Sequence, residues 1–180
     1  MMMTRAECLK KYGSDYYIQQ QINAGKLHRI EKGIYSEDAH APELAIISAK
    51  YPKAIVTMQS AFYHYGLTDA IPDVCDLATD RDSAKISDSR IRQYFMPKHF
   101  FLDGVTTAEE RGYPFRIYNR ERMLIELLRY KSKLPFDLYK EILLNYRKIM
   151  RQLNIQMIQD YVLAAPKSSM IMDALQMEVL

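Results

Sequence analysis

The sequence predicts an α+β protein: a small N-terminal helical module with a β-hairpin, then a mixed domain with a small β-sheet and a helical C-terminal half. Three observations support this prediction. Capped helical segments and a glycine-bounded hairpin pattern occupy the first 36 residues. Short apolar or alternating segments follow in the middle of the chain. From Asn119 onward, apolar residues recur at helical spacing. We therefore expect two domains, residues 1–38 and 42–180.

Composition restricts the class of protein. A chain of 180 residues with 48% hydrophobic content can bury one core, or one core plus a small appended module. Cys8 and Cys75 lack metal-ligand spacing and form no disulfide framework, which favours a reducing cytoplasm. No apolar run approaches the roughly 20 residues that span a bilayer, and the N-terminus lacks the pattern of a signal peptide. We expect a cytoplasmic protein without a membrane partner.

The distribution of charge is more informative than the formal net charge of +3. Residues 1–36 contain six Lys or Arg against three Asp or Glu, whereas residues 37–100 contain seven against nine. The remaining residues contain twelve against ten. The basic excess per residue is therefore greatest in the first 36 residues, as expected for a small module that faces nucleic acid.

Two short helices are predicted at the N-terminus. Thr4 followed by Glu7 is a capping-box pattern, and the helix that it begins should stop at Tyr12-Gly13. Ser14 or Asp15 caps a second helix, and Gly25 ends it because glycine adopts the left-handed conformation at little cost.

The second helix has one apolar and one polar face. Ile18 and Ile22 lie four residues apart and should point inward. The opposite face is rich in side-chain amides and a phenol, namely Tyr16, Gln19, Gln20 and Asn23. Side-chain amides can bond bidentately to adenine in the major groove, although a solvated polar face is the alternative interpretation.

A basic β-hairpin follows, with strands expected at residues 26–30 and 33–36. Leu27 and Ile34 supply apolar contacts, whereas Arg29 and Lys32 should remain near the surface. Helix, turn, amide-rich helix and basic hairpin follow in the order of a winged helix-turn-helix. Only three methionines precede the first helix, so we expect a truncated module that lacks a full first helix. An ordinary surface hairpin is the alternative.

The mixed domain is predicted from alternating strands and helices. Strands are expected at residues 54–57, 74–79 and 92–96, and a strand pair at residues 104–109 and 114–118 around Arg111-Gly112. Helices are expected at residues 43–50, 59–65, 121–130, 136–150, 155–164 and 169–180.

No motif requires an enzyme, a cofactor or a metal, and we assign no catalytic residue. Four scattered histidines never share one helix face at ligand spacing. A metal-dependent nuclease is nevertheless a rival interpretation, because carboxylates near a strand can hold a divalent ion beside a lysine. The residues in this pattern are Asp73, Asp76, Asp80, Asp82 and Lys85. A solvated loop, with Asp76 on the exposed face of its strand, is the simpler interpretation.

The Arg120 and Arg122 pair beside Asn119 also permits two interpretations. The two guanidinium groups could bind an anion or nucleic acid. Alternatively, Asn119 caps a helix and Arg122 packs against its own sheet, which is the interpretation that we favour.

Several short motifs together resemble the AbiEi-type antitoxins of type IV toxin-antitoxin systems, which act in bacterial phage defence. The motifs are the glycine-bounded series from Gly25 to Tyr35, then Tyr51-Pro52, Ser60-Ala61, and the run from Tyr65 to Asp69 with Pro72. The resemblance extends more loosely to the strand pair and to the run from Tyr118 to Arg122.

This resemblance implies a DNA-binding repressor that is also an antitoxin. In this family a winged helix-turn-helix binds inverted repeats in double-stranded DNA upstream of its own operon. The rest of the protein counteracts a nucleotidyltransferase-like toxin without forming a stable complex. A homodimer would match an inverted-repeat operator. The residues that would face DNA are Ser14, Tyr16, Gln19, Gln20, Asn23, Lys26, Arg29 and Lys32. A protein-binding antitoxin that does not bind DNA is a further alternative.

Overall fold

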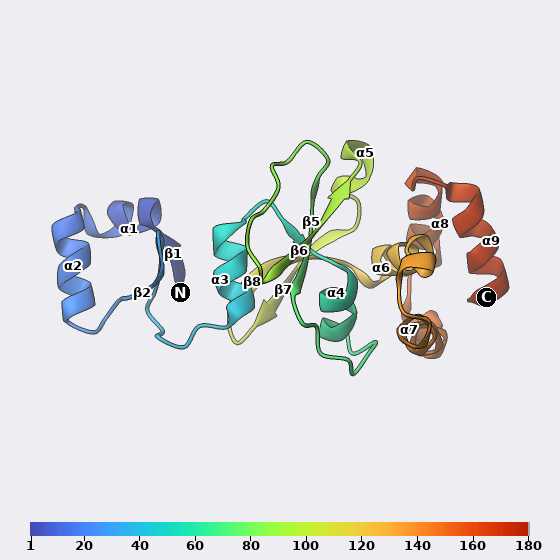
Figure 1. Ribbon diagram of the computed structural model, residues 1–180, viewed down its shortest axis with the longest axis horizontal. Coiled ribbons are helices and arrows are strands. Elements are labelled where there is room, and N and C mark those ends of the chain that lie inside the picture. Colours follow the sequence, from blue (N-terminus) through green and yellow to red (C-terminus); the bar gives the residue numbers. More distant parts are fainter. Residues whose placement is uncertain (180) are drawn as a thin grey trace. The chain divides into compact units, whose positions relative to one another are not determined.

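The computed structural model describes residues 1–179 and has an α+β fold, as predicted. These residues form nine α-helices, two short 3-10 helices and eight strands in two sheets (Figure 1). The chain divides into two compact units. Unit 1 contains residues 1–53 and 107–116, and unit 2 contains residues 54–106 and the chain from residue 117 onward. This division differs from the expected domains of 1–38 and 42–180.

Unit 1 begins with a three-stranded antiparallel sheet and two helices. The strands occur in the spatial order β1-β3-β2, and α1 and α2 lie between β1 and β2 in the chain. The elements are β1 (Met2–Thr4), α1 (Arg5–Tyr12), α2 (Asp15–Asn23), β2 (His28–Glu31), β3 (Ile34–Ser36) and α3 (Glu43–Lys50).

The predicted caps define both N-terminal helices. The Thr4 side chain accepts a hydrogen bond from the Glu7 backbone N–H, and the Glu7 carboxylate accepts one from the Thr4 N–H at 2.7 Å. The Ser14 hydroxyl caps α2 by accepting from the Tyr17 N–H. After α2, Gly25 has a φ of +70°, the left-handed conformation that ends a helix. The capping predictions are confirmed.

A small apolar core holds α1 and α2 against the sheet. Its five buried members are Met3, Cys8, Ile18, Leu27 and Tyr35, and three partly buried side chains pack around them. These side chains come from β1, α1, α2 and β3 and from Leu27, which directly precedes β2. The core therefore fixes α2 relative to the hairpin.

The sequence analysis missed β1. Residues 2–4 were expected only to precede a helix, but they form a strand that pairs with β3 along its whole length. The third helix that contacts this sheet is α3, which packs against β1 and β3. The tip of the β7–β8 hairpin also belongs to unit 1, where the hydroxyls of Ser36 and Tyr113 lie 3.4 Å apart.

The second sheet has five strands of mixed orientation in the spatial order β6-β5-β4-β8-β7. β4 pairs antiparallel with β5 and parallel with β8, and β5 pairs parallel with β6. The strands are β4 (Ile55–Val56), β5 (Cys75–Asp80), β6 (Ile91–Met96), β7 (Val105–Glu110) and β8 (Tyr113–Tyr118).

β7 and β8 are neighbouring strands that continue from unit 2 into unit 1. Arg111 and Gly112 form the two-residue loop between them, with φ values of +51° and +83°. Positive φ at both central residues is the geometry of a type I′ turn, which suits the twist of a hairpin. The predicted turn at this position is confirmed.

Helices α6 to α9 gather beside one another in the C-terminal half, coloured yellow to red in Figure 1. The buried helix α6 contacts α7, α8 and α9. The helices of unit 2 are α4 (Met58–His64), α5 (Lys98–Phe101), α6 (Arg120–Arg129), α7 (Phe136–Ile149), α8 (Ile155–Ala164) and α9 (Ser168–Glu178), with 3-10 turns η1 (Lys131–Lys133) and η2 (Met150–Gln152) flanking α7. None of the helices within residues 1–179 combines the length and apolar character needed to cross a lipid bilayer.

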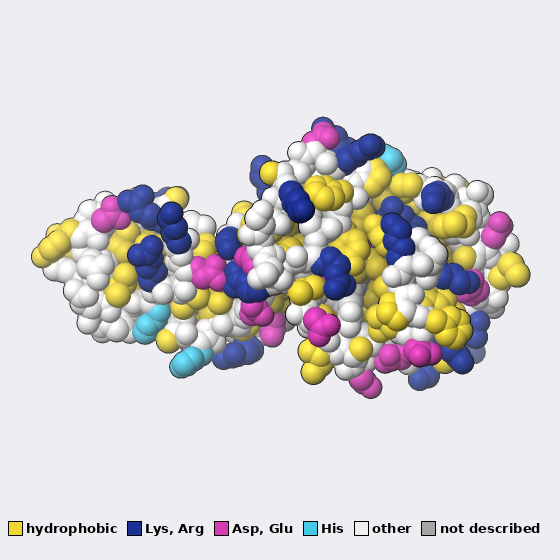
Figure 2. Space-filling view, viewed as in Figure 1, with side chains coloured by type: hydrophobic (Ala, Val, Ile, Leu, Met, Phe, Trp, Pro, Cys, Tyr) yellow, Lys and Arg dark blue, Asp and Glu magenta, His cyan; other side chains and the backbone are white. Residues whose placement is uncertain are grey.

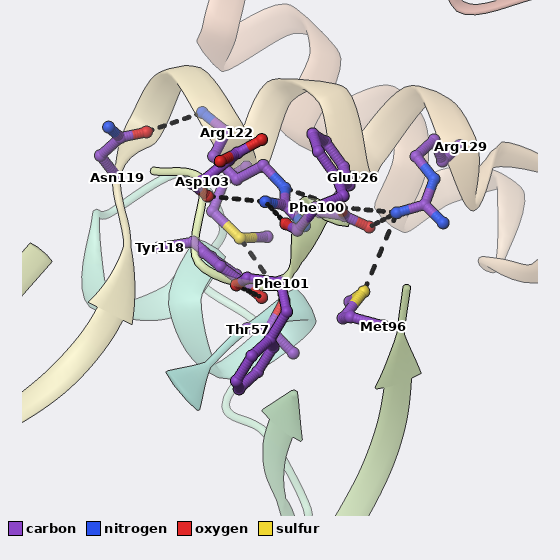
Figure 3. A network of polar contacts seen from close by, with 11 residues as sticks. Thr57, Met96, Phe100, Phe101, Asp103, Tyr118, Asn119, Arg122, Glu126 and Arg129 are labelled. Carbon is purple, nitrogen blue, oxygen red and sulfur yellow. Dashed lines mark hydrogen bonds and ion pairs between the residues drawn. The ribbon is translucent and has the colours of Figure 1, made fainter. Parts of the chain in front are cut away.

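A buried guanidinium joins α6 to the sheet and to α5. The Arg122 side chain is fully buried and stacks between the rings of Phe100 and Tyr118, at 3.4 and 4.2 Å. Its Nη1 donates to the carbonyls of Phe100 and Asp103 at 2.6 Å, and its Nε donates to Glu126 at 2.9 Å. Figure 3 shows these groups converging. The interpretation of Arg122 as a packing residue is therefore supported by its full burial.

The neighbouring residues complete this network. The Asn119 side chain caps α6 by accepting from the Arg122 N–H at 2.8 Å. Arg129 Nη1 donates to both carboxylate oxygens of Glu126, at 2.7 and 2.8 Å. A buried charge is tolerated only when such partners replace its hydration.

Gly104 leaves the space that Arg122 occupies. A Cβ built on Gly104 would lie 2.5 Å from the Arg122 Cβ, and the φ of Gly104 is +78°. Gly66 has a similar φ of +66°, but nothing lies within 4 Å of its Cβ position.

We predict that Gly104→Ala destabilises the protein more than Gly66→Ala. Both changes place a side chain at positive φ, which costs about 1–2 kcal/mol, but only Gly104→Ala adds overpacking of about 1–3 kcal/mol. Urea unfolding of both variants measures the difference. Equal losses of unfolding free energy would show that Arg122 moves aside without cost.

Candidate nucleic-acid interface

The polar face predicted on α2 is exposed. Ile18 is buried and Ile22 packs at the margin of the core, which turns the opposite side of the helix outward. Tyr16 is 67% exposed. The exposed amides on the same face are Gln19, Gln20 and Asn23. In Figure 2 the surface over α2 is largely white, the colour of backbone and uncharged polar side chains.

Hydrogen bonds along the helix order these side chains in two pairs. Gln19 Nε2 donates to Asn23 Oδ1 at 3.0 Å, and Gln20 Nε2 donates to the Tyr16 hydroxyl at 3.0 Å. Each pair joins residues one helical turn apart. Gln19 and Gln20 keep a free carbonyl oxygen, and the Asn23 amide keeps both N–H groups. The face can therefore still offer donors and acceptors to a ligand.

Ser14 differs from the other predicted residues of this face. It is only partly exposed, and its hydroxyl accepts the capping hydrogen bond from the Tyr17 N–H. Tyr17 itself was not among the predicted site residues, yet it is 54% exposed and its ring lies edge-on to that of Tyr16 at 5.4 Å. Tyr17 lies on the flank of the helix, between the apolar and polar faces, so helical periodicity did not assign it to the predicted interface.

The three predicted cations are also exposed. Lys26 lies three residues after the end of α2, where its N–H donates to the Gln21 carbonyl. Arg29 lies on β2 opposite Tyr35, and Lys32 lies in the turn before β3. None of these three cations forms an ion pair with any residue in the described part of the chain.

The hairpin is shaped and held by specific contacts. Its register shifts between Arg29 and Glu31, so Ile30 forms a bulge. The Arg5 N–H donates to the Gly33 carbonyl at 2.9 Å, which joins the turn to the start of α1. The Glu31 carboxylate lies 3.4 Å from Lys50 on α3 and is partly neutralised by it. The hairpin therefore presents positive charge while its one carboxylate is engaged.

Arg5 and Asp15 join the two helices in front of this face. Arg5 donates to Asp15 through Nε and Nη2, and the shorter contact is 2.7 Å. Because this pair is exposed, it contributes little to stability.

The acidic pattern considered for a nuclease does not assemble. No group of three His, Cys, Asp or Glu side chains that could hold a metal ion occurs within residues 1–179. Asp82 instead forms an exposed ion pair with Lys98, and Asp73 is exposed. The nuclease interpretation therefore gains no support from the geometry.

Asp76 is not on a solvated strand face, contrary to expectation. It is 1% exposed because β5 is an interior strand and both faces of the sheet are covered there. Its Oδ2 accepts from the Gln59 N–H at 2.9 Å, and Arg92 lies 3.6 Å from Oδ1. Burial raises the pKa of Asp76 to about 6, although Arg92 and the backbone N–H groups oppose this shift.

Comparisons with known proteins do not identify a family for this chain. A scan against protein-family models and a search of curated proteins each found no match to this sequence. The fold and the candidate interface define an α+β protein with an exposed, amide-rich helix beside unpaired cations.

Asp76 should make the protein less stable as the pH rises. Because the pKa of Asp76 is raised in the folded state, folding takes up a proton near pH 5. The stability that Asp76 contributes in its protonated form is lost as the pH rises through about 6. Between about pH 4 and pH 7, the wild type should lose about 1–3 kcal/mol of unfolding free energy relative to Asp76→Asn. Urea unfolding across this range measures the effect.

Asp73→Asn is the matched control, because it removes an exposed carboxylate only three residues before Asp76 in the chain. If the unfolding free energies of wild type and Asp76→Asn differed by the same amount at every pH, the raised pKa of Asp76 would be contradicted.

Proposed function

We propose that this protein is a sequence-specific DNA-binding repressor that also serves as an antitoxin. In this proposal unit 1 acts as a winged helix-turn-helix, with α2 as the recognition helix and the β2–β3 hairpin as the wing. The observation that carries the proposal is the exposed amide face of α2 next in the chain to a hairpin with unpaired cations. The β1-α1-α2-β2-β3 order also supports it.

The chemistry of the two surfaces suits two parts of a DNA duplex. A major groove about 12 Å wide admits one helix, and side-chain amides pair bidentately with adenine there. The candidates for this contact are Gln19, Gln20 and Asn23, and Tyr16 could reach a phosphate or a thymine methyl group. Lys26, Arg29 and Lys32 would neutralise phosphates without reading sequence.

A third helix beside the sheet would support this module. The sequence predicted a truncated winged helix-turn-helix, whose two helices alone bury little apolar surface. In unit 1, α3 packs against β1 and β3 and adds a helix to the small sheet. Autonomous folding of the DNA-binding module would then require the chain at least as far as α3.

The antitoxin part of the proposal rests on the resemblance of several short motifs to those of AbiEi-type antitoxins. One of them, the run from Tyr65 to Asp69, closes α4 at Gly66 and buries Leu67 and Thr68. The Thr68 hydroxyl donates to Glu141 on α7 at 3.1 Å. This motif therefore has a structural role in unit 2, because it connects the end of α4 to α7. The proposed functional partner is a nucleotidyltransferase-like toxin that forms no stable complex with the protein.

Two alternatives remain distinguishable by experiment. An antitoxin that acts only by binding a protein would not shift the DNA upstream of its own gene. A metal-dependent nuclease would cleave DNA with added magnesium, and Asp76→Asn would abolish that cleavage. No contact in the described residues favours either alternative over the DNA-binding repressor.

The amide face should determine specificity. We predict that Gln20→Ala combined with Asn23→Ala lowers affinity for the operator by about tenfold to a hundredfold, because each lost base contact costs about 1–3 kcal/mol. Affinity for random duplex should stay nearly unchanged. Mobility-shift titrations on both DNAs measure this, with Gln156→Ala and Gln159→Ala on α8 as the matched control. Equal losses on both DNAs would remove the base-reading role.

The wing should determine the salt dependence. Arg29→Ala combined with Lys32→Ala should make the slope of log affinity against log salt shallower by about 2, because each neutralised phosphate contributes about 0.9. Fluorescence anisotropy at several salt concentrations measures the slope. The control, Arg81→Ala with Lys85→Ala, removes the same charge from an exposed loop of unit 2. An unchanged slope in the wing variant would refute phosphate contacts by the hairpin.

A further inference from the structure

The most basic stretch of the chain lies in unit 2, outside the proposed DNA interface. Residues 131–152, which contain η1, α7 and η2, have six Lys or Arg against two Asp or Glu. This excess is larger over 22 residues than that of the whole N-terminal module. Where Figure 1 places α7, Figure 2 shows Lys and Arg side chains together with Asp or Glu and apolar side chains.

One face of α7 is buried and the other is exposed. The buried face consists of Tyr139, Ile142, Leu143 and Tyr146. The exposed face carries a row of cations that continues into both flanking 3-10 turns. We call this row the basic stripe; its members are Lys133, Lys140, Arg147, Lys148 and Arg151.

The charges of the basic stripe are largely uncompensated. Lys140, Lys148 and Arg151 form no ion pair with the described residues. The two carboxylates of this segment, Asp137 and Glu141, form no ion pair with these three cations. Glu141 instead accepts from the Thr68 hydroxyl and the Asp69 N–H, at 3.1 and 3.0 Å.

The cations of α7 gather on one side of the helix. Lys140 precedes Arg147 by seven residues and Lys148 by eight, which places them about two turns apart on one side of the helix. Solvated helices more often alternate the signs of their charges, which gives stabilising pairs instead. The stripe is therefore better suited to an external anion than to water alone.

An exposed aromatic ring lies at the start of the same face. Phe136, the first residue of α7, is 73% exposed and precedes Lys140 by one helical turn. Lys133 precedes it by three residues, so cations flank the ring along the chain. Leu144, between Lys140 and Lys148, is 43% exposed.

We propose that the basic stripe binds single-stranded nucleic acid. Phosphates would lie along Lys140, Lys148 and Arg151, and a base would stack on the ring of Phe136. A duplex would not use the exposed ring, since its base faces are already stacked. A membrane surface is less suitable, because the apolar face of α7 is packed inside unit 2 and leaves only two exposed apolar side chains. This proposal does not depend on the DNA-binding role of unit 1.

The test uses the full chain with oligouridylate and oligothymidylate as probes, and random duplex DNA and phosphatidylserine vesicles as comparisons. Lys140→Ala, Lys148→Ala and Arg151→Ala together should weaken single-strand binding at least tenfold. They should also reduce its salt slope by about 2, because each phosphate contact to a single strand contributes about 0.7. Phe136→Ala should weaken binding about fivefold or more without changing the slope.

The matched control removes three cations elsewhere in unit 2, at Arg81, Lys85 and Lys98, and should leave single-strand binding unchanged. Arg29→Ala with Lys32→Ala should likewise leave the single-strand salt slope unchanged, which separates this site from the wing. Thermal unfolding checks that each variant remains folded. Comparing the two oligonucleotides distinguishes RNA from DNA as the source of the strand.

Three outcomes would overturn the proposal. The first is equal loss of binding in the stripe variant and the control variant. The second is a stripe-dependent affinity that is greater for duplex than for single strands. The third is stripe-dependent binding to the anionic vesicles with no binding to either oligonucleotide.

Discussion

The buried guanidinium of Arg122 is the constraint on which the larger unit depends. A cation removed from water must regain its hydrogen bonds from the protein, and an unpaired partner would cost several kcal/mol. Two backbone carbonyls, Glu126 and two aromatic faces meet most of that requirement, and only Nη2 is buried without a hydrogen-bond partner. They also determine how α5, β8 and α6 meet, because Asn119 caps α6 at this point and Gly104 leaves the necessary space. The sheet and the C-terminal helices are thereby held in one arrangement.

Unit 1, the smaller of the two, is stabilised by apolar packing among a small number of side chains. Its buried cluster has five members, and a core of that size is marginal for an independent module. β1 and α3 enlarge the unit beyond the helix-turn-helix and hairpin alone. The same packing turns the amide face of α2 outward. The nine-residue helix α2 therefore stabilises the unit through its apolar face and forms the candidate interface with its polar face.

The two proposed binding surfaces differ in chemistry. The α2 face combines amides with nearby cations and is suited to reading bases in a groove. The basic stripe on α7 combines cations with one exposed ring and is suited to a flexible strand whose bases are accessible. A regulator that binds its own operator through one surface could contact a second nucleic acid through the other. The first surface has a proposed role in operator binding, and the second is an inference from the structure alone.

Local sequence signals determined much of this protein. The capping box at Thr4, the glycine that ends α2, the Arg111-Gly112 turn and most helices were predictable, because these features depend on residues close together in the chain. Tertiary structure decided the rest. β1 forms only because β3 is available as a partner, and Asp76 is buried only because β5 lies inside the sheet. Strand pairing and two-sided burial join residues far apart in sequence, so no local pattern reveals them.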